Sequence, residues 1–132
     1  MKRNLFLLFI LILVSGTSLF SQVQQPKVPS LKPVWYVEDL YFIYQALDNI
    51  EIQGSEVEPF LDVKKNIQTA LQLSQTQKKQ LSETIQTEVP FQTAQNLVNF
   101  LGRAKFAGKN AEQYKRFIDA IIEASKALQP QK

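Results

Sequence analysis

The most concentrated set of side chains that could do chemistry is a group of carboxylates near the middle of the chain. Glu56, Glu58 and Asp62 lie within seven residues, and Glu51 precedes them closely. Such oxygens could bind Ca²⁺, which takes about six to eight ligands, but the spacing of an EF-hand loop is absent. Two carboxylates held roughly 5 to 9 Å apart could instead hydrolyse a glycosidic bond. The simpler interpretation is that acidic residues at the start of a helix stabilise its exposed amides.

Two residue types that carry much of enzyme chemistry are missing. The chain of 132 residues contains no cysteine and no histidine. Without cysteine there is no disulfide, thiol nucleophile, thiolate metal site or lipid-bearing N-terminal cysteine. Without histidine, the commonest general base and transition-metal ligand are absent. Because the sequence also lacks Gly-x-Ser-x-Gly, Ser-x-x-Lys and a glycine-rich phosphate loop, we predict a non-enzymatic protein without a cofactor. A carboxylate-dependent enzyme is the catalytic alternative.

The N-terminus has the pattern of a secretory signal peptide. Lys2 and Arg3 precede ten apolar residues, 5–14, and small residues follow. Ten residues rise about 15 Å as a helix, which is half the hydrocarbon core of a membrane. We therefore expect residues 1–21 to be a signal peptide cleaved after Ser21, with Ser18 as the alternative site, and the protein to be exported to the periplasm or the medium. An uncleaved membrane anchor is the other interpretation, and only then do we expect contact with a membrane.

The charge of the expected mature chain is nearly balanced. Of 15 basic residues, Lys2 and Arg3 lie in the predicted signal, which leaves 13 against 12 acidic residues. Nucleic acid is therefore not an expected partner. A basic group could contact an anionic component of the cell envelope, such as lipid head groups or a glycan, or an acidic protein. This candidate patch comprises Arg103, Lys105, Lys109, Lys115 and Arg116. A solvated helix face is the alternative.

Aromatic residues are concentrated directly after the last proline of the N-terminal region. The five are Trp35, Tyr36, Tyr41, Phe42 and Tyr44. Aromatic side chains with a polar tip are common anchors of protein interfaces. We therefore take these residues as the candidate interface and expect the partner to be a protein. Alternatively, they form the core and core rim of a small domain.

The rest of the pattern predicts helices that hold these groups. Pro26, Pro29 and Pro33 prevent a helix over residues 22–34 and favour an extended arm that tethers the signal to a helical domain at residues 35–132. A first helix follows from Tyr36 to about Ile50, and Gly54 interrupts the pattern.

Further helices are expected from capping boxes and apolar spacing. Ser55 with Glu58 opens one helix, and Ser74 with Gln77 opens the next. The apolar stripe of the first of these helices is Phe60, Val63, Ile67 and Ala70 or Leu71, and that of the second is Leu81, Ile85 and Val89. A later helix has the stripe Phe91, Ala94, Leu97 or Val98 and Leu101, and it is expected to end at Gly108. The last helix begins after a cap at Asn110, and its stripe is Tyr114, Phe117, Ile118, Ile121, Ile122, Ser125 and Leu128. Only Ile50-Glu51-Ile52 alternates like a strand. We predict an all-α fold, a small antiparallel bundle of four to five amphipathic helices.

One segment resembles a known family. Residues 73–81, Leu-Ser-Gln-Thr-Gln-Lys-Lys-Gln-Leu, resemble the Leu-Thr-x-x-Gln segment of the periplasmic LTxxQ family, which includes Spy-type helical chaperones and metal-resistance sensors. Ser74 stands where the family has threonine, and a second copy of the segment is missing. The resemblance implies no site residues. It makes a Spy-like periplasmic chaperone the alternative to our main prediction, an exported binding or structural protein.

Overall fold

The computed structural model describes residues 27–129, so the predicted signal peptide at 1–21 and both candidate cleavage sites lie outside the described residues. The described part confirms a mostly helical fold and adds short strands to it. In chain order the elements are β1 (Ser30–Leu31), β2 (Val34–Tyr36), α1 (Val37–Leu47), the 3₁₀ turn η1 (Gly54–Glu56), α2 (Val57–Thr76), β3 (Thr84–Gln86), β4 (Val89–Pro90), α3 (Phe91–Leu101), the 3₁₀ turn η2 (Gly108–Asn110) and α4 (Ala111–Lys126).

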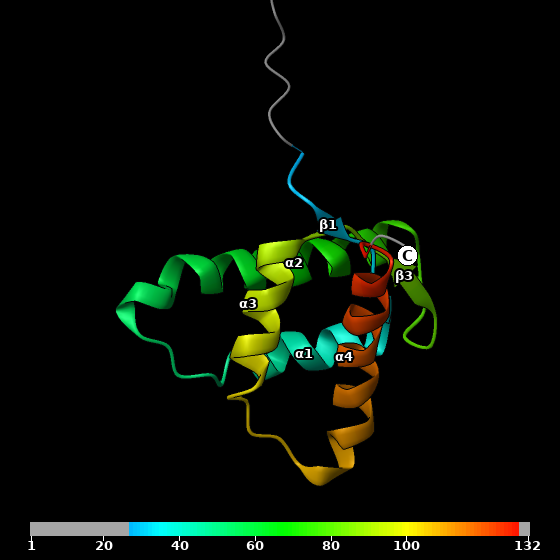
Figure 1. Cartoon of the computed structure of the whole chain (residues 1–132). Helices are drawn as coiled ribbons and strands as arrows, with labels where there is room; N and C mark the ends of the chain where they lie inside the picture. Colours follow the sequence, from blue (N-terminus) through cyan, green and yellow to red (C-terminus); the bar gives the residue numbers. More distant parts are fainter. Residues whose placement is uncertain (1–26, 130–132) are drawn as a thin grey trace, which may run out of the picture.

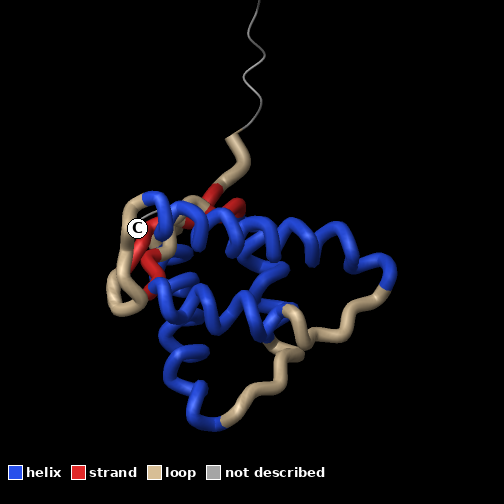
Figure 2. Tube along the Cα trace, turned by 180° about the vertical axis from the view of Figure 1, so that it is seen from behind, coloured by secondary structure: helices blue, strands red, loops and turns tan. Residues whose placement is uncertain are grey.

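The four helices do not share one axis direction. α1 and α2 lie side by side and run in opposite directions, whereas α3 crosses α2 and α4 crosses α1 near its start (Figure 1). Seen from behind, the loop between α1 and α2 and the loop between α3 and α4 project at the edge of the molecule, away from the strands (Figure 2). The antiparallel relationship expected for the whole bundle therefore describes α1 and α2, with α3 and α4 packed across them.

The four strands form one continuous two-stranded ribbon, which we call the ribbon. β1 pairs antiparallel with β4, and β2 pairs antiparallel with β3. The register is the same in both ladders, with Leu31 opposite Val89 and Trp35 opposite Ile85. Between them the Thr87 amide donates to the Pro33 carbonyl at 3.3 Å, so the pairing continues across the gap. Part of the expected N-terminal arm is thus built into the fold.

Burial along the first strand of the ribbon alternates with a period of two. Odd-numbered residues from 31 to 37 are buried, and even-numbered residues from 32 to 36 are exposed. The inference that only residues 50–52 alternate is therefore wrong. The alternation was hidden because Val34 and Tyr36, which face solvent, are themselves apolar or aromatic.

The helix predicted from Ser74 through Val89 is also wrong. α2 continues through Ser74 and ends at Thr76. The buried Ser74 hydroxyl donates backwards to the Leu71 carbonyl at 2.7 Å instead of accepting a bond from an amide ahead of it. Lys78 then adopts a positive φ of 54°, which stops the helix. The segment that resembles the LTxxQ motif accordingly lies at a helix end, and the residues after it enter β3.

The remaining helix ends differ from expectation in detail. α2 is preceded by a capping box between Gln53 and Glu56, not between Ser55 and Glu58. α3 ends at Leu101, well before Gly108, which begins η2 instead. Asn110 does precede α4, but its side chain makes no capping hydrogen bond.

The predicted buried faces are better supported than the helix ends. All five apolar residues expected on the inner face of α2 are buried. Of the residues expected on the inner face of α3, Ala94, Leu97 and Leu101 are buried, whereas Phe91 remains 37% exposed. Phe100 was not expected there, yet it is buried and meets the Phe60 ring edge-to-face at 5.2 Å. In α4 only Phe117 and Ile121 of the long predicted stripe are buried, so much of that stripe remains near the surface.

Candidate functional site

An apolar groove runs between α3 and α4. It has a volume of about 370 Å³. Its apolar walls are Leu31, Phe91, Ala94, Val98, Ile121 and Ile122. The other lining residues are three side-chain amides and one serine, and no charged residue lines the groove. We call this feature the α3–α4 groove.

Three large apolar side chains of the α3–α4 groove remain accessible to solvent. Phe91 is 37% exposed, Val98 is 36% exposed and Ile122 is 47% exposed. Phe91 and Val98 are two helical turns apart, which places them on the same face of α3. Leu97 and Leu101 already fill the core side of that helix. The sequence left Leu97 and Val98 as alternatives for one stripe, and the structure assigns Leu97 to the core and Val98 to the groove.

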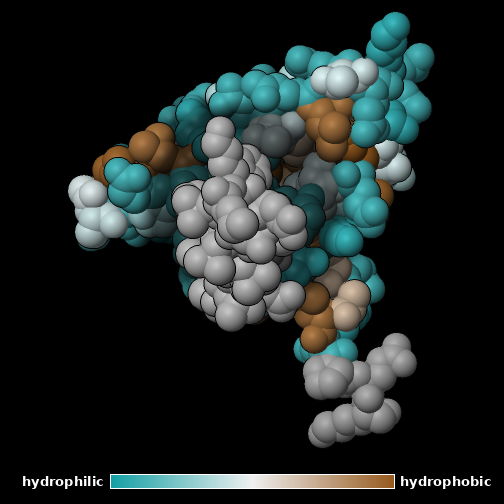
Figure 3. Space-filling model, turned by 90° about the horizontal axis from the view of Figure 1, so that it is seen from above, coloured by the Kyte–Doolittle hydropathy of each residue, from teal (hydrophilic) through white to brown (hydrophobic). Residues whose placement is uncertain are grey.

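The face of the molecule that is seen from above is mainly hydrophilic (Figure 3). In the view from above, hydrophobic side chains appear as separate brown patches between larger hydrophilic areas (Figure 3). Other exposed apolar residues, such as Leu61 at 52%, do not line the α3–α4 groove. Isolated exposed residues of this kind are normal on a soluble domain. A concave group of them is the feature that distinguishes this groove.

The five candidate aromatic residues do not form one surface. Trp35 is 1% exposed and belongs to the core. Tyr36 lies under the guanidinium of Arg116, 4.4 Å from the centre of its ring. Tyr41 accepts a hydrogen bond from a glutamine of α2, and Tyr44 faces Lys64 of the same helix.

The fifth aromatic residue belongs to a cluster that the sequence did not indicate. Phe42 meets the edge of Phe106 at 5.9 Å, and Phe106 in turn lies 4.7 Å from Tyr114. Phe106 sits in the irregular segment between α3 and η2, where no periodic pattern could reveal it. An interface role for the four partly exposed aromatic residues stays a prediction.

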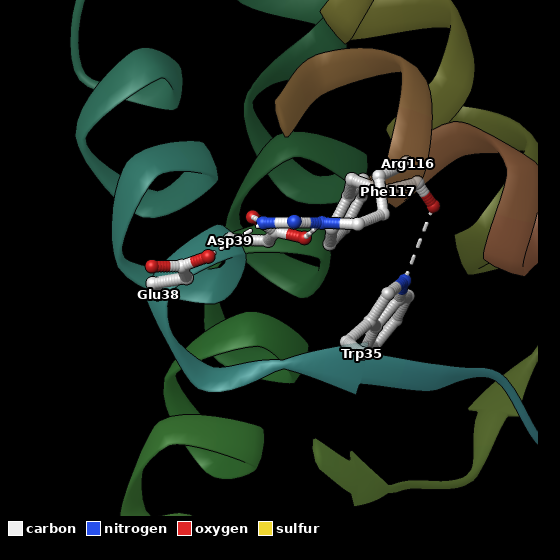
Figure 4. Close-up of polar contacts among 5 residues, drawn as sticks. All are labelled: Trp35, Glu38, Asp39, Arg116 and Phe117. Atoms are coloured by element: carbon white, nitrogen blue, oxygen red, sulfur yellow. Dashed lines mark hydrogen bonds and ion pairs between the residues drawn. The ribbon is translucent and has the colours of Figure 1, made fainter. Parts of the chain in front are cut away.

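Arg116, from the candidate basic patch, is held by two carboxylates at the start of α1. Its guanidinium donates to Asp39 at 2.7 and 2.5 Å and to Glu38 at 2.6 Å (Figure 4). Asp39 is only 1% exposed, and a buried carboxylate is costly without such a partner. The hydrogen bonds that Arg116 donates to Asp39, and then the one that it donates to Glu38, raise the pKa of Arg116. This arrangement ties α4 to α1.

The other basic residues of the patch are placed differently. Arg103 donates to both oxygens of Glu56 at 3.1 Å, and Lys115 pairs with Asp119 on its own helix. Lys105 and Lys109 make no ion pair with any residue between 27 and 129. Acidic neighbours therefore compensate three of the five charges, which weakens the attraction for an anionic partner.

Of the central carboxylates, Glu56 is engaged at the start of α2. The Gln53 amide donates to Glu56 at 2.9 Å. This hydrogen bond, together with the pair to Arg103, holds the pKa of Glu56 below its usual value. Among residues 27–129, no group of three or more His, Cys, Asp or Glu side chains is arranged to hold a metal ion. The geometry of Glu56 agrees with the helix-start interpretation.

The comparisons with known proteins give no relative. No protein-family model matches the sequence, and no curated protein or solved structure is significantly similar to the chain. Within the described residues, none of the helices has the length and apolar content needed to cross a membrane. The α3–α4 groove is therefore the candidate binding site on the ground of its own geometry.

Proposed function

We propose that this chain is an exported, non-enzymatic protein that binds a partner protein through the α3–α4 groove. The observation that carries the proposal is that Phe91, Val98 and Ile122 stay 36 to 47% exposed while lining one concave surface. Apolar side chains gathered in a concavity favour binding, because a partner that covers them removes apolar area from water. The export part of the proposal rests on the pattern of residues 1–21.

The chemistry of the groove favours an amphipathic helix as the bound element. No charged side chain lines the groove, so a partner gains nothing there from charge. The groove is about 370 Å³, near the lower end of the roughly 300 to 1,000 Å³ typical of small-molecule pockets, which suits a few side chains. A helix presents apolar side chains in one row at steps of about three and four residues, and it lies readily between two other helices. The amides at the edge of the groove can bond to its polar flank.

Site-specific photo-crosslinking in the native cell tests this proposal. A photoreactive phenylalanine analogue replaces Val98 in the full-length chain, and in a second chain it replaces Leu61, which is exposed on α2. We expect one discrete adduct from position 98 and no such adduct from position 61. Adding Ile122→Glu to the position-98 chain should remove the adduct, because a buried charge opposes apolar contact.

The adducts also separate the alternatives. A ladder of many adducts from position 98 would indicate a chaperone that binds many clients, as the Spy-like alternative requires. An adduct of twice the chain mass would show that a second copy occupies the groove. Equal adducts from both positions, or none from position 98, would contradict the proposal. The mass of the recovered chain reports in the same experiment whether residues 1–21 or 1–18 have been removed.

A further inference from the structure

A second groove lies between α2 and the part of the ribbon formed by β3 and β4. Its lining is mostly polar, whereas that of the α3–α4 groove is mostly apolar. It has a volume of about 410 Å³ and is lined by Lys32, Asn66, Thr69, Gln86, Thr87 and Glu88, together with apolar residues of α2. We propose that this groove binds an extended peptide segment of a partner protein, which adds to residues 84–88 as a third strand. This proposal is independent of the α3–α4 groove.

The first argument is the edge of the ribbon at residues 84–88, which no further strand among residues 27–129 covers. The backbone amide of Val37 donates to the Glu83 carbonyl, and the backbone amide of Thr87 donates to the Pro33 carbonyl. The odd-numbered residues therefore form the hydrogen bonds between the two sides of the ribbon. In an antiparallel pair the residues between them direct their N–H and C=O groups away from the partner strand. Gln86 and Glu88 are such residues, and both line the groove. An unpaired edge of this kind is a template for another strand.

The second argument is a pair of buried polar atoms without partners. Asn66 Oδ1 and Thr87 Oγ1 are buried and make no hydrogen bond with any described residue. Both residues line the groove, one from α2 and one from the ribbon. A buried polar atom that lacks a hydrogen bond costs stability, so most such atoms in proteins have one. The amide oxygen of Asn66 can only accept, so the occupant must supply a donor.

Three of the remaining polar side chains of the groove are already engaged. Thr69 donates to the Lys65 carbonyl at 2.8 Å, and the Gln86 amide donates to the Lys32 carbonyl at 3.4 Å. The Glu88 carboxylate accepts from Ser30 at 2.5 Å, which lowers the pKa of Glu88. What is left to recognise a ligand is the backbone edge, the two unpaired side-chain atoms and the ammonium group of Lys32.

An extended peptide meets these requirements together. Its backbone offers an N–H donor and a C=O acceptor on the same side at every second residue, which matches the edge at Gln86 and Glu88. Strand addition of this kind obtains its affinity from main-chain hydrogen bonds. Lys32 and Glu88 bring one charge of each sign, so the peptide needs no net charge. A helical peptide cannot satisfy the edge, because its own amides are used internally.

A titration followed by two-dimensional NMR tests the proposal with a defined probe. The probe is the capped peptide Thr-Val-Thr-Val-Thr-Val, added to ¹⁵N-labelled mature chain. We expect the amide signals of Gln86 and Glu88 to shift on addition. A matched control peptide carries an N-methyl group on every residue, so neither of its sides can donate to the edge. Because strand addition depends on main-chain hydrogen bonds, this peptide should not shift the two signals.

Variants of the protein check the two side chains. Asn66→Ala and Thr87→Val, the second of which keeps the side-chain shape, should each weaken binding by about fivefold, the equivalent of one ordinary hydrogen bond. Gln68→Ala, at an exposed position of the same helix, should leave binding unchanged. No shift at Gln86 and Glu88, or equal shifts with the fully methylated peptide, would overturn the proposal and would leave water as the partner of the two atoms.

Discussion

The indole ring of Trp35 lies parallel to the phenyl ring of Phe117, with the ring centres 4.7 Å apart (Figure 4). The Trp35 Nε1–H also donates to the Phe117 carbonyl at 3.3 Å, across 82 residues of chain. Both residues are almost fully buried, at 1% and 0% exposure. The contact fixes the first strand of the ribbon to α4, so the segment that follows the predicted signal is part of the core.

Replacing Trp35 by alanine should destabilise the protein strongly. The change removes a buried aromatic side chain and leaves a cavity, for which we expect a loss of about 3 to 5 kcal/mol in the free energy of unfolding. Urea unfolding followed by circular dichroism measures it, since Trp35 is the only tryptophan and its fluorescence disappears with it. Leu61→Ala, at a residue that is 52% exposed, should change the value by less than about 0.5 kcal/mol. Similar losses for both variants would contradict this core role.

Shortening the chain from its N-terminus should show where the fold begins. A chain that starts at Lys27 should have the same helical circular dichroism spectrum and melting temperature as one that starts at Gln22, because the ribbon is intact in both. A chain that starts at Val37 should lose cooperative melting, because it lacks the whole first strand and Trp35. Cooperative melting of this shortest chain would show that the ribbon is dispensable.

Removing Arg116 should leave Asp39 as a buried charge without a partner. We expect Arg116→Met to lower the free energy of unfolding by about 2 to 3 kcal/mol, less than for a fully buried pair because Arg116 is 43% exposed. Adding Asp39→Asn should recover part of the loss, because the unpaired charge is then gone. Lys115→Met, which breaks an exposed pair one residue earlier, should have little effect. If the double variant is less stable than Arg116→Met alone, the pair does not act as described.

Glu56 should contribute stability that depends on pH. Its pKa in the folded protein lies below the usual value of 4.5, so the contribution is complete above that value and is lost as the pH falls through the lowered pKa. The difference in unfolding free energy between the wild-type protein and Glu56→Gln should therefore be larger at pH 7 than at pH 3. Glu123→Gln, at a side chain that is 70% exposed, should give a small difference at both values. If the difference in unfolding free energy for Glu56→Gln is as large at pH 3 as at pH 7, the Glu56 carboxylate does not stabilise the capping box with Gln53 as described.

The buried faces of the helices could be predicted from the sequence because apolar spacing reports directly on burial. The inner residues of α2 and α3 follow that spacing closely. The strands could not be predicted, because each is only two or three residues long and the paired residues lie 48 to 60 positions apart in the chain. Ser74 misled for a local reason: the letters of a capping box also fit a serine that bonds back within its own helix.

The candidate site was only partly visible in the sequence. Val98 and Ile122 could be assigned to apolar stripes, but a stripe does not reveal which of its members face the core and which face a groove between two helices. That division depends on how α4 lies against α3, which is set by distant contacts such as Trp35 with Phe117. The charge pattern suggested a basic patch open to an anionic partner. In the folded protein Arg103 and Arg116 instead form ion pairs with Glu56 and Asp39, which lie far away in the sequence.

The most direct test of the proposed function is the affinity of a chain that starts at Gln22 for the protein that crosslinks from position 98. Isothermal titration calorimetry would compare the wild-type chain with Val98→Glu and with Leu61→Glu, which places the same charge at an exposed apolar residue of α2. We predict that Val98→Glu raises the Kd at least about tenfold, equivalent to 1.4 kcal/mol, and that Leu61→Glu leaves it unchanged. Equal Kd values for the three chains would contradict binding through the α3–α4 groove.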